Sequence, residues 1–244
     1  MNEKLEITVS RLIQMRMSSI GKKLAEMSED PNFNLHKPED LFYELVDFEY
    51  NKRMEKKMND RLEKSHLKYK AATLDSSLKD PDRKIDVNLI YNLSECNWIR
   101  DKNNLLLTGK TGTGKSYLAC ALGICALYKS MSVLYTKASL MINDLCDIIR
   151  IGKYNEGLRK YSNPDLLIID DFGSMTLDIE KCLHLFEVLD SREGNGATMV
   201  ISQLSVRDWY DIFQNNIYAD SCLSRLTKKA YRIDLQGRDM RMDE

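Results

Sequence analysis

The sequence predicts an α/β fold in which helices cover a parallel sheet, preceded by a small helical domain. From residue 103 onward, short apolar runs alternate with longer segments in which apolar residues recur at helical spacing, which is typical of a parallel sheet covered on both faces. Before that point the patterns are helical, apart from one segment without periodicity. We expect a helical N-terminal domain over residues 1–69, a linker over 70–86 and the α/β domain over 87–244.

The N-terminal domain is predicted to contain two helices. Apolar residues recur at near-helical spacing over 7–27. A second helix is expected over 38–66, because Pro38 suits a first helical turn. The linker carries turn-forming residues at 80–82, and a further helix is expected over 87–99.

The second helix has a strong excess of positive charge. Residues 52–70 include eight lysines and arginines but three acids, although the whole chain has a formal net charge of −1. Such a helix can neutralise DNA phosphates and release counterions, which gives affinity for duplex DNA of any sequence. An ordinary solvated helix face would have the same composition, so both interpretations stay open. The candidate DNA-binding residues are Lys52, Arg53, Lys56, Lys57, Arg61 and Lys64.

The α/β domain is expected to contain five strands and five helices after residue 103. The expected strands are 104–108, 132–136, 166–170, 198–202 and 231–234. The expected helices are 115–128, 139–151, 177–192, 206–215 and 219–228.

The most specific motif lies between the first strand and its helix. Residues 109–116 fit the phosphate-binding pattern G-x-x-x-x-G-K-[ST]. Glycines allow backbone N–H groups to converge on an anion, and the helix N-terminus adds partial positive charge. Lys115 would reach the β- and γ-phosphates of ATP, and Ser116 would bind Mg²⁺. The candidate cofactor-binding residues are Gly109, Lys110, Thr111, Gly112, Thr113, Gly114, Lys115, Ser116 and Tyr117.

A second motif is an apolar strand that ends in two acids. Residues 166–171 read Leu-Leu-Ile-Ile-Asp-Asp, which is a Walker B pattern. Asp170 would bind Mg²⁺ and Asp171 would polarise the attacking water. Glutamate is more usual at the second position, and the shorter aspartate must reach further. Two acids that merely cap a strand are the alternative, which the upstream P-loop disfavours.

Two further candidates follow from the order of elements. The strand over 198–202 ends in Ser202 and Gln203, where a polar side chain would lie beside the γ-phosphate. Gln203 is the candidate sensor, Ser202 is its competitor, and a simple turn is equally compatible. Arg225 lies on the second helix after this strand, where a guanidinium could reach a neighbouring subunit's γ-phosphate as an arginine finger. Taken alone, an arginine on a helix is usually solvated.

Together these segments resemble the IstB/DnaC-like branch of the AAA+ ATPases, and above all the IstB-like ATP-binding helpers of insertion sequences. The P-loop is generic, whereas the Ser-Gln-Leu and C-terminal segments are more specific. The similarity includes the N-terminal helices and so covers nearly the whole chain. Its main segments are 104–116, 167–173, 201–209, 219–226 and 231–241, the last similar to a terminal G-x-S-x-R signature with Asp239 in place of Ser.

The resemblance implies a P-loop AAA+ core that binds ATP and Mg²⁺. It implies a homo-oligomer that forms on double-stranded DNA and helps the transposase of the same element to select a target. Residues 1–69 would then be the DNA-binding and oligomerisation domain. It also implies that Arg225 is the arginine finger and that Arg241 is a candidate second sensor. The main alternative is a DnaC-like helicase loader that acts on a replicative helicase and single-stranded DNA. A small-molecule kinase is another alternative, but the sequence shows no segment that would bind a phosphate acceptor. An ATP-gated scaffold with little turnover is a third, because Asp171 is shorter than the usual glutamate.

Composition restricts where the protein acts. No apolar run is long enough to span a bilayer, and the first residues lack the apolar segment of a secretory signal. The six cysteines show no C-x-x-C pairing. We therefore expect a cytoplasmic protein without a membrane partner or a structural metal.

Overall fold

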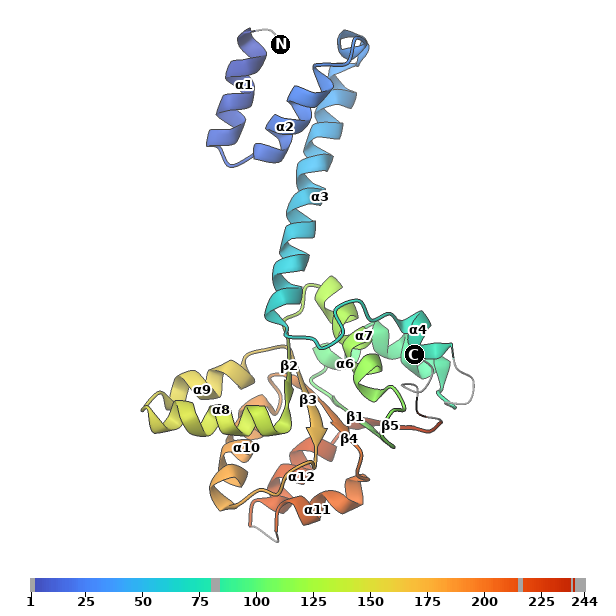
Figure 1. The fold of residues 1–244 in the computed structure, drawn as a ribbon, viewed down its shortest axis with the longest axis vertical. Helices are drawn as coiled ribbons and strands as arrows, with labels where there is room; N and C mark the ends of the chain where they lie inside the picture. Colours follow the sequence, from blue (N-terminus) through green and yellow to red (C-terminus); the bar gives the residue numbers. More distant parts are fainter. Residues whose placement is uncertain (1–2, 80–83, 215–216, 238, 240–244) are drawn as a thin grey trace. The chain divides into compact units, whose positions relative to one another are not determined.

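The computed structural model describes residues 3–79, 84–214, 217–237 and 239 (Figure 1). The chain forms two compact units, one up to Asp60 and one from Arg61 onward. The division between them falls inside one long helix, α3 (Pro38–Lys64). The compact units therefore have a different boundary from the functional domain predicted over 1–69, which stays a prediction.

The first unit is helical. The sequence predicted one helix over 7–27, and this was wrong: the helix is broken at Arg16, whose φ is +60°. The break lets the apolar stripes of two helices pack together with α3, and Ile20, Leu24 and Leu45 form a small buried core. A single uninterrupted helix could not bury both stripes. The elements are α1 (Glu3–Gln14), α2 (Ser18–Met27), the 3₁₀ helix η1 (Phe33–Leu35) and the N-terminal part of α3.

The second unit is built on a parallel sheet. Its strands run in the order β2-β3-β4-β1-β5, and every pairing between described neighbours is parallel. All five predicted strands are present, and no bound differs from its prediction by more than two residues. The strands are β1 (Asn104–Gly109), β2 (Val133–Lys137), β3 (Leu166–Phe172), β4 (Ala197–Ser202) and β5 (Ala230–Leu235).

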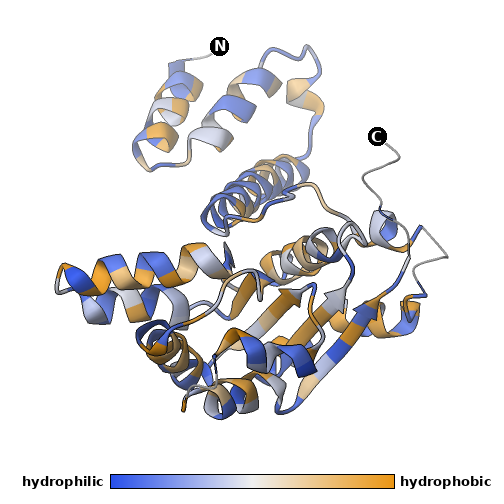
Figure 2. Ribbon diagram, turned by 60° about the horizontal axis from the view of Figure 1, so that its bottom comes forward, coloured by the Kyte–Doolittle hydropathy of each residue, from blue (hydrophilic) through white to orange (hydrophobic). Residues whose placement is uncertain are grey.

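Helices cover both faces of this sheet, and its inner strands are predominantly hydrophobic (Figure 2). On one face, Leu106, Leu167 and Val200 pack in one buried cluster with residues of α8 (Ala138–Arg150), α10 (Ile179–Arg192) and α12 (Ala219–Thr227). The other face is covered by α7 (Lys115–Tyr128), where Gly123 lies against Ile168. The predicted two-sided coverage is confirmed.

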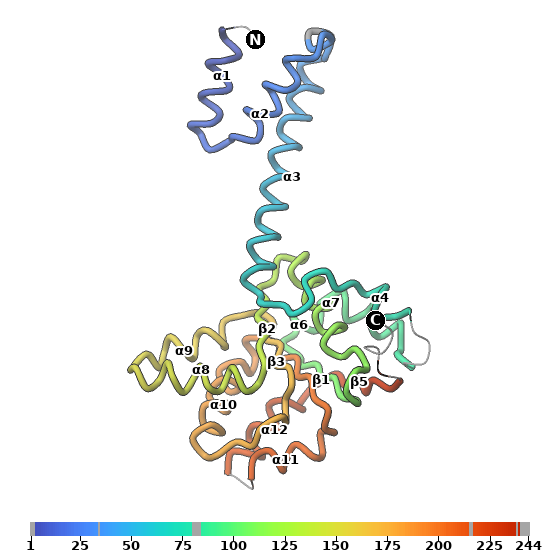
Figure 3. The backbone as a smooth tube through the Cα atoms, viewed as in Figure 1, coloured from blue at the N-terminus to red at the C-terminus, as the bar shows by residue number. Residues whose placement is uncertain are grey.

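Several predicted helices differ in their details. The helix predicted over 87–99 is two helices, α5 (Val87–Ser94) and α6 (Asn97–Arg100), because Cys96 adopts a left-handed conformation with φ +59°. The helix predicted over 206–215 consists of η3 (Val206–Asp208) and α11 (Trp209–Ile212). An unpredicted helix, α9 (Tyr154–Ser162), runs beside α8 (Figure 3).

The described part of the segment predicted as a linker also has structure, whereas the turn predicted at 80–82 lies outside the described residues. The described part contains α4 (Leu74–Leu78), which packs on α7. The Thr73 side chain caps α4 by accepting a hydrogen bond from the N–H of Ser76 at 3.3 Å. The helix is too short for periodicity to reveal it.

None of the helices in the described part of the chain has both the length and the apolar character needed to cross a bilayer.

Candidate nucleotide-binding site

A cavity of about 440 Å³ lies at the carboxyl end of the strands and contains most of the predicted site. Ligands bind at this end of open parallel sheets. The predicted residues that line the cavity are Thr111, Gly112, Gly114, Lys115, Ser116, Tyr117, Asp170, Asp171, Ser202 and Gln203. Ile201 also lines the cavity. So do Lys68, Tyr69 and Ser76, which the sequence did not predict to lie there.

The P-loop has the backbone conformation that its glycines were predicted to allow. Gly109, Gly112 and Gly114 have φ values of +137°, +80° and +81°. A Cβ atom at Gly109 would overlap the carbonyl oxygen of Leu235, so only glycine fits there. The buried Lys115 donates hydrogen bonds from Nζ to the carbonyl oxygens of Gly109 at 2.7 Å and Lys110 at 2.6 Å. Its ammonium therefore lies beside the backbone of the loop.

Asp239, near the end of the chain, lies against the P-loop. A Cβ atom at Gly112 would overlap the carboxylate of Asp239, which stands in the segment that resembles the terminal signature. Arg241, the predicted second sensor, lies outside the described residues.

The two acids at the end of β3 lie in a β-bulge. The register with β4 runs from Ile169–Val200 directly to Phe172–Ser202, and Asp171 has φ +55°. Bulges near active sites commonly change the direction of a side chain. The N–H of Asp171 donates to Oδ1 of Asp170 at 2.7 Å. The bulge thus brings both acids to the cavity, although adjacent residues of a regular strand would point to opposite faces.

Asp170 has a partner that the sequence did not reveal. Its side chain is buried, and Tyr135 on β2 donates a hydrogen bond from its hydroxyl to Oδ2 of Asp170. Burial, followed by this hydrogen bond, raises the pKa of Tyr135, so the hydroxyl stays a donor at neutral pH. The tyrosine fixes one carboxylate oxygen of Asp170 and leaves the carboxylate facing the cavity.

Asp171 also has a partner on β2. Nζ of Lys137 lies 2.8 Å from Oδ2 of Asp171. This hydrogen bond and the carboxylate charge raise the pKa of Lys137, so the side chain is a cation at neutral pH. The two groups are about half exposed, so water competes with the ion pair.

The geometry separates the two candidate sensors. Ser202 is buried, and its hydroxyl donates to the carbonyl oxygen of Phe172 at 2.6 Å. The hydroxyl oxygen of Ser202 also accepts from the N–H of Leu204 at 3.1 Å and from Nε1 of Trp209 at 3.2 Å. The hydrogen-bonding capacity of Ser202 is therefore used within the fold. Gln203 is exposed, and its Oε1 accepts from the hydroxyl of Thr111 in the P-loop at 2.6 Å. Gln203 is therefore better placed to respond to a bound phosphate.

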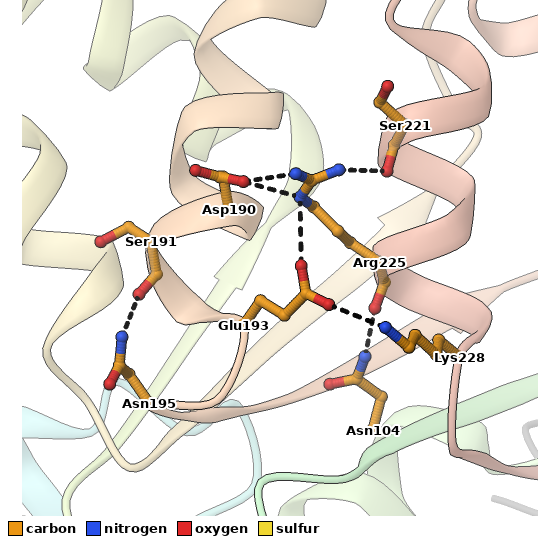
Figure 4. Close-up of polar contacts among 8 residues, drawn as sticks. All are labelled: Asn104, Asp190, Ser191, Glu193, Asn195, Ser221, Arg225 and Lys228. Atoms are coloured by element: carbon orange, nitrogen blue, oxygen red, sulfur yellow. Dashed lines mark hydrogen bonds and ion pairs between the residues drawn. The ribbon is translucent and has the colours of Figure 1, made fainter.

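Arg225 lies outside the cavity, at the opposite end of the strands. Its Nε donates to Oδ1 of Asp190 at 3.0 Å, and a second guanidinium nitrogen binds the same oxygen (Figure 4). It also donates to the carbonyl oxygen of Ser221 at 3.2 Å, and Nε lies 3.6 Å from Oε2 of Glu193. The guanidinium stacks over the ring of Phe186, 4.5 Å from its centroid. Within one subunit the predicted arginine finger is thus held by Asp190 of α10 and by Glu193, which follows that helix.

The predicted DNA-binding residues in the first unit have different surroundings. Lys52 forms an exposed ion pair with Glu55 at 2.9 Å. Arg53 binds Glu49 at 2.7 Å and the carbonyl oxygen of Arg16 at 2.9 Å. Burial alone would raise the pKa of Glu49, but its hydrogen bonds with Arg53 and with the N–H of Ile20 outweigh that effect and lower it. Arg53 therefore has a structural role, whereas Lys56 and Lys57 are exposed.

The other two residues of the predicted DNA-binding set belong to the second unit. Arg61 donates to the hydroxyl of Ser130 at 3.1 Å and is partly buried. Lys64, in the last turn of α3, is exposed. The exposed lysines of the set are thus better placed for phosphate contact than its two arginines.

Known proteins match the sequence of this chain over almost its whole length. Residues 10–244 match the family described as IstB-like ATP binding protein. An insertion sequence ATP-binding protein of Sinorhizobium fredii is 32% identical over 237 residues, which cover 97% of this chain and 96% of that protein. An insertion sequence ATP-binding protein of Pseudomonas fluorescens is 33% identical over 81% of this chain and 85% of that protein.

Solved structures match the fold. The DnaC helicase loader matches with a TM-score of 0.59 at 20% identity, over 68% of this chain and 97% of that chain. AMPPCP-bound DnaA from Aquifex aeolicus matches with a TM-score of 0.60 at 19% identity, over 72% of this chain and 53% of that chain. This chain therefore spans about half the length of that DnaA. At these identities the likeness shows the fold alone, which is that of the AAA+ ATPases.

Proposed function

Because this chain belongs to the IstB-like ATP binding protein family and is an AAA+ ATPase, we propose that it assembles with ATP on double-stranded DNA and assists an insertion-sequence transposase in target selection. The observation that carries the ATP-dependent part is the meeting of Lys115, Ser116, Asp170 and Asp171 in one cavity. The relatives that are named for insertion sequences support the rest.

Each group in the cavity has a chemical role in this proposal. The P-loop N–H groups and Lys115 bind the phosphates of ATP. Ser116 and Asp170 fit Mg²⁺, because both offer the hard oxygen ligands that this ion prefers and both line the cavity. Asp171 polarises the water that attacks the γ-phosphate, and Gln203 senses that phosphate through the loop. Arg225 acts on the nucleotide of a neighbouring subunit in the oligomer, after leaving Asp190.

DNA binding rests on the exposed lysines of α3. Lys56, Lys57 and Lys64 present positive charge to solvent, as phosphate contact requires. We place this activity in the cytoplasm, where six free cysteines, five of them buried, would stay reduced. A helicase loader is the second candidate, since the DnaC loader shares the fold over nearly its full length.

The test measures ATP turnover and sedimentation of the purified protein without DNA, with single-stranded DNA and with duplex DNA. We expect duplex DNA with ATP to drive assembly and stimulate turnover, and Lys115→Ala to abolish both effects. A response to single-stranded DNA alone would favour the loader. No response to either DNA would refute the nucleic-acid part of the proposal.

A second measurement tests the DNA surface. The double variant Lys56→Ala/Lys57→Ala should make the negative slope of log K against log salt concentration for duplex DNA less steep by roughly 1.8, since each phosphate contact contributes about −0.9. Lys22→Ala, which removes another exposed lysine of the first unit, is the matched control and should leave the slope unchanged. An unchanged slope in the double variant would exclude these lysines from the DNA contact.

A further inference from the structure

One side of the nucleotide cavity consists of residues to which the proposed function gives no role. Lys68, Tyr69 and Ser76 line the same cavity as Lys115 and Asp170. They belong to the chain between α3 and α5, part of which was predicted to be a linker. This stretch therefore forms part of the cavity wall.

The wall is built into the fold. The carbonyl oxygen of Ser65 accepts a hydrogen bond from the N–H of Tyr135 on β2 at 2.8 Å. Leu67 and Ala72 are buried, with exposed fractions of 2% and 4%. The N–H of Thr73 donates to the hydroxyl of Tyr117 at 3.3 Å. Anchors on both sides of Tyr69 thus hold this segment in place beside the cavity.

The wall presents an aromatic ring with a positive charge over it. The rings of Tyr69 and Tyr117 lie 5.5 Å apart between centroids and are tilted by 49°. Tyr69 keeps an exposed fraction of 38%, so its ring is accessible. Nζ of Lys68 lies 5.1 Å from the centroid of the Tyr69 ring. A flat aromatic ring joined to phosphates matches both properties.

The other lining residues show which part of a nucleotide this wall would meet. The P-loop takes the phosphates, and Asp170, Asp171 and Gln203 lie where the γ-phosphate and its ion are processed. The ribose and base must then occupy the remaining part of the cavity. Ser202 also lines the cavity, but its hydroxyl is hydrogen-bonded within the fold. The lining residues left for the ribose and base are Lys68, Tyr69, Ser76, Tyr117 and Ile201.

We propose that Tyr69, supported by Tyr117, forms the base-binding wall of the site and stacks against the adenine of ATP. This inference rests on the proposed nucleotide binding and adds the residues that recognise the nucleoside. Stacking on an aromatic side chain is favourable for any nucleobase, because every base has a π-face. Tyr69 lies only five residues after Lys64, the last residue of α3, so the bound base contacts the chain close to the end of the basic helix.

The test compares two ligands on the full chain by titration calorimetry. ATP carries a base, and inorganic tripolyphosphate carries only the phosphates. Tyr69→Ala should weaken ATP binding on the order of tenfold and leave tripolyphosphate binding unchanged, whereas Tyr69→Phe, which keeps the ring, should bind ATP like the unaltered protein. Tyr128→Ala, which removes an exposed tyrosine at the other end of α7, is the matched control. Lys115→Ala should weaken both ligands.

Three outcomes would overturn the inference. Equal weakening of both ligands by Tyr69→Ala would show a structural role, and no weakening of ATP binding would place the base elsewhere. If the unaltered protein binds neither ligand, the proposed nucleotide binding fails first. Should Tyr69→Ala lower the melting temperature, Tyr69→Leu makes the same comparison, because it keeps apolar contact but has no aromatic face.

Discussion

The ion pair that holds Arg225 gives a quantitative prediction about assembly. Two guanidinium nitrogens bind one carboxylate oxygen of Asp190. The side chains of Arg225 and Asp190 are 22% and 53% exposed, so the pair is partly screened by water. Such pairs stabilise a fold by about 1 kcal/mol at most, and a doubly hydrogen-bonded arginine lies at the upper end of that range. If Arg225 acts on a neighbouring subunit, assembly must first break this pair.

Asp190→Asn should therefore make assembly easier. Removing the carboxylate charge lowers the cost of freeing Arg225 by about 1 kcal/mol at each interface, which corresponds to roughly fivefold in an association constant. We expect the protein concentration at half-maximal ATP-dependent assembly on duplex DNA to fall about fivefold. The free energy of unfolding of the isolated subunit should fall by about 1 kcal/mol or less.

Sedimentation velocity across a protein concentration series measures the assembly midpoint, and thermal melting measures stability. Asp211→Asn removes another exposed acid of the same unit and should change neither. The double variant Asp190→Asn/Arg225→Ala should lose the gain, because the freed side chain is then absent. The reasoning is refuted if Asp190→Asn leaves the midpoint unchanged or raises it, since Arg225 would then serve only the fold of its own subunit.

Three further predictions concern the residues around the acids and the buried thiols. Tyr135→Phe should raise the Mg²⁺ concentration needed for half-maximal ATP binding, because Asp170 loses the donor that orients it; Tyr161→Phe, which removes a hydroxyl bound to Asp144 at 2.6 Å, should lower stability without changing the Mg²⁺ dependence. Lys137→Met should raise ATP turnover per site, because the Asp171 carboxylate then accepts only from water; lower turnover would instead make Lys137 a positioning residue. Burial raises the pKa of the Cys222 thiol to about 12 and that of the Cys182 thiol to about 11, from an ordinary value of 9.0. Between the ordinary pKa and these raised values, the folded chain keeps thiol protons that the unfolded chain releases, so the free energy of unfolding should fall as pH rises from about 9. Both thiols should also resist disulfide reagents at pH 8 until the protein is denatured.

Local sequence patterns were sufficient for the central sheet and the phosphate-binding loop. Apolar runs with glycine or acids at their ends depend only on neighbouring residues, so the strands and α7 could be predicted within one or two residues. Breaks in helices were missed, since Arg16 and Cys96 adopt left-handed conformations that neither residue type favours. Tertiary packing imposes these conformations, and periodicity does not record it.

The cavity residues also show which features local sequence patterns cannot predict. The P-loop and the Asp170-Asp171 pair could be predicted because each is contiguous in sequence. Choosing Gln203 over Ser202 required knowing that Trp209 donates to the serine hydroxyl. The role of Tyr69 required knowing that the chain after α3 returns to the first turn of α7.

The strand β2 supplies the partners of both acids, and this follows from register. Tyr135 pairs with Ile168 and Lys137 pairs with Asp170 across the β2–β3 ladder, and their spacing of two residues places both side chains on one face of the sheet. The bulge in β3 turns Asp170 and Asp171 toward that same region, so that each acid meets a different donor. The P-loop and the acids define which chemistry the cavity can perform, whereas the neighbouring strand decides how readily each carboxylate accepts a ligand. With the roles proposed for Asp170 and Asp171, a substitution in β2 should therefore change metal binding and water activation separately, although no residue of β2 belongs to a recognised motif.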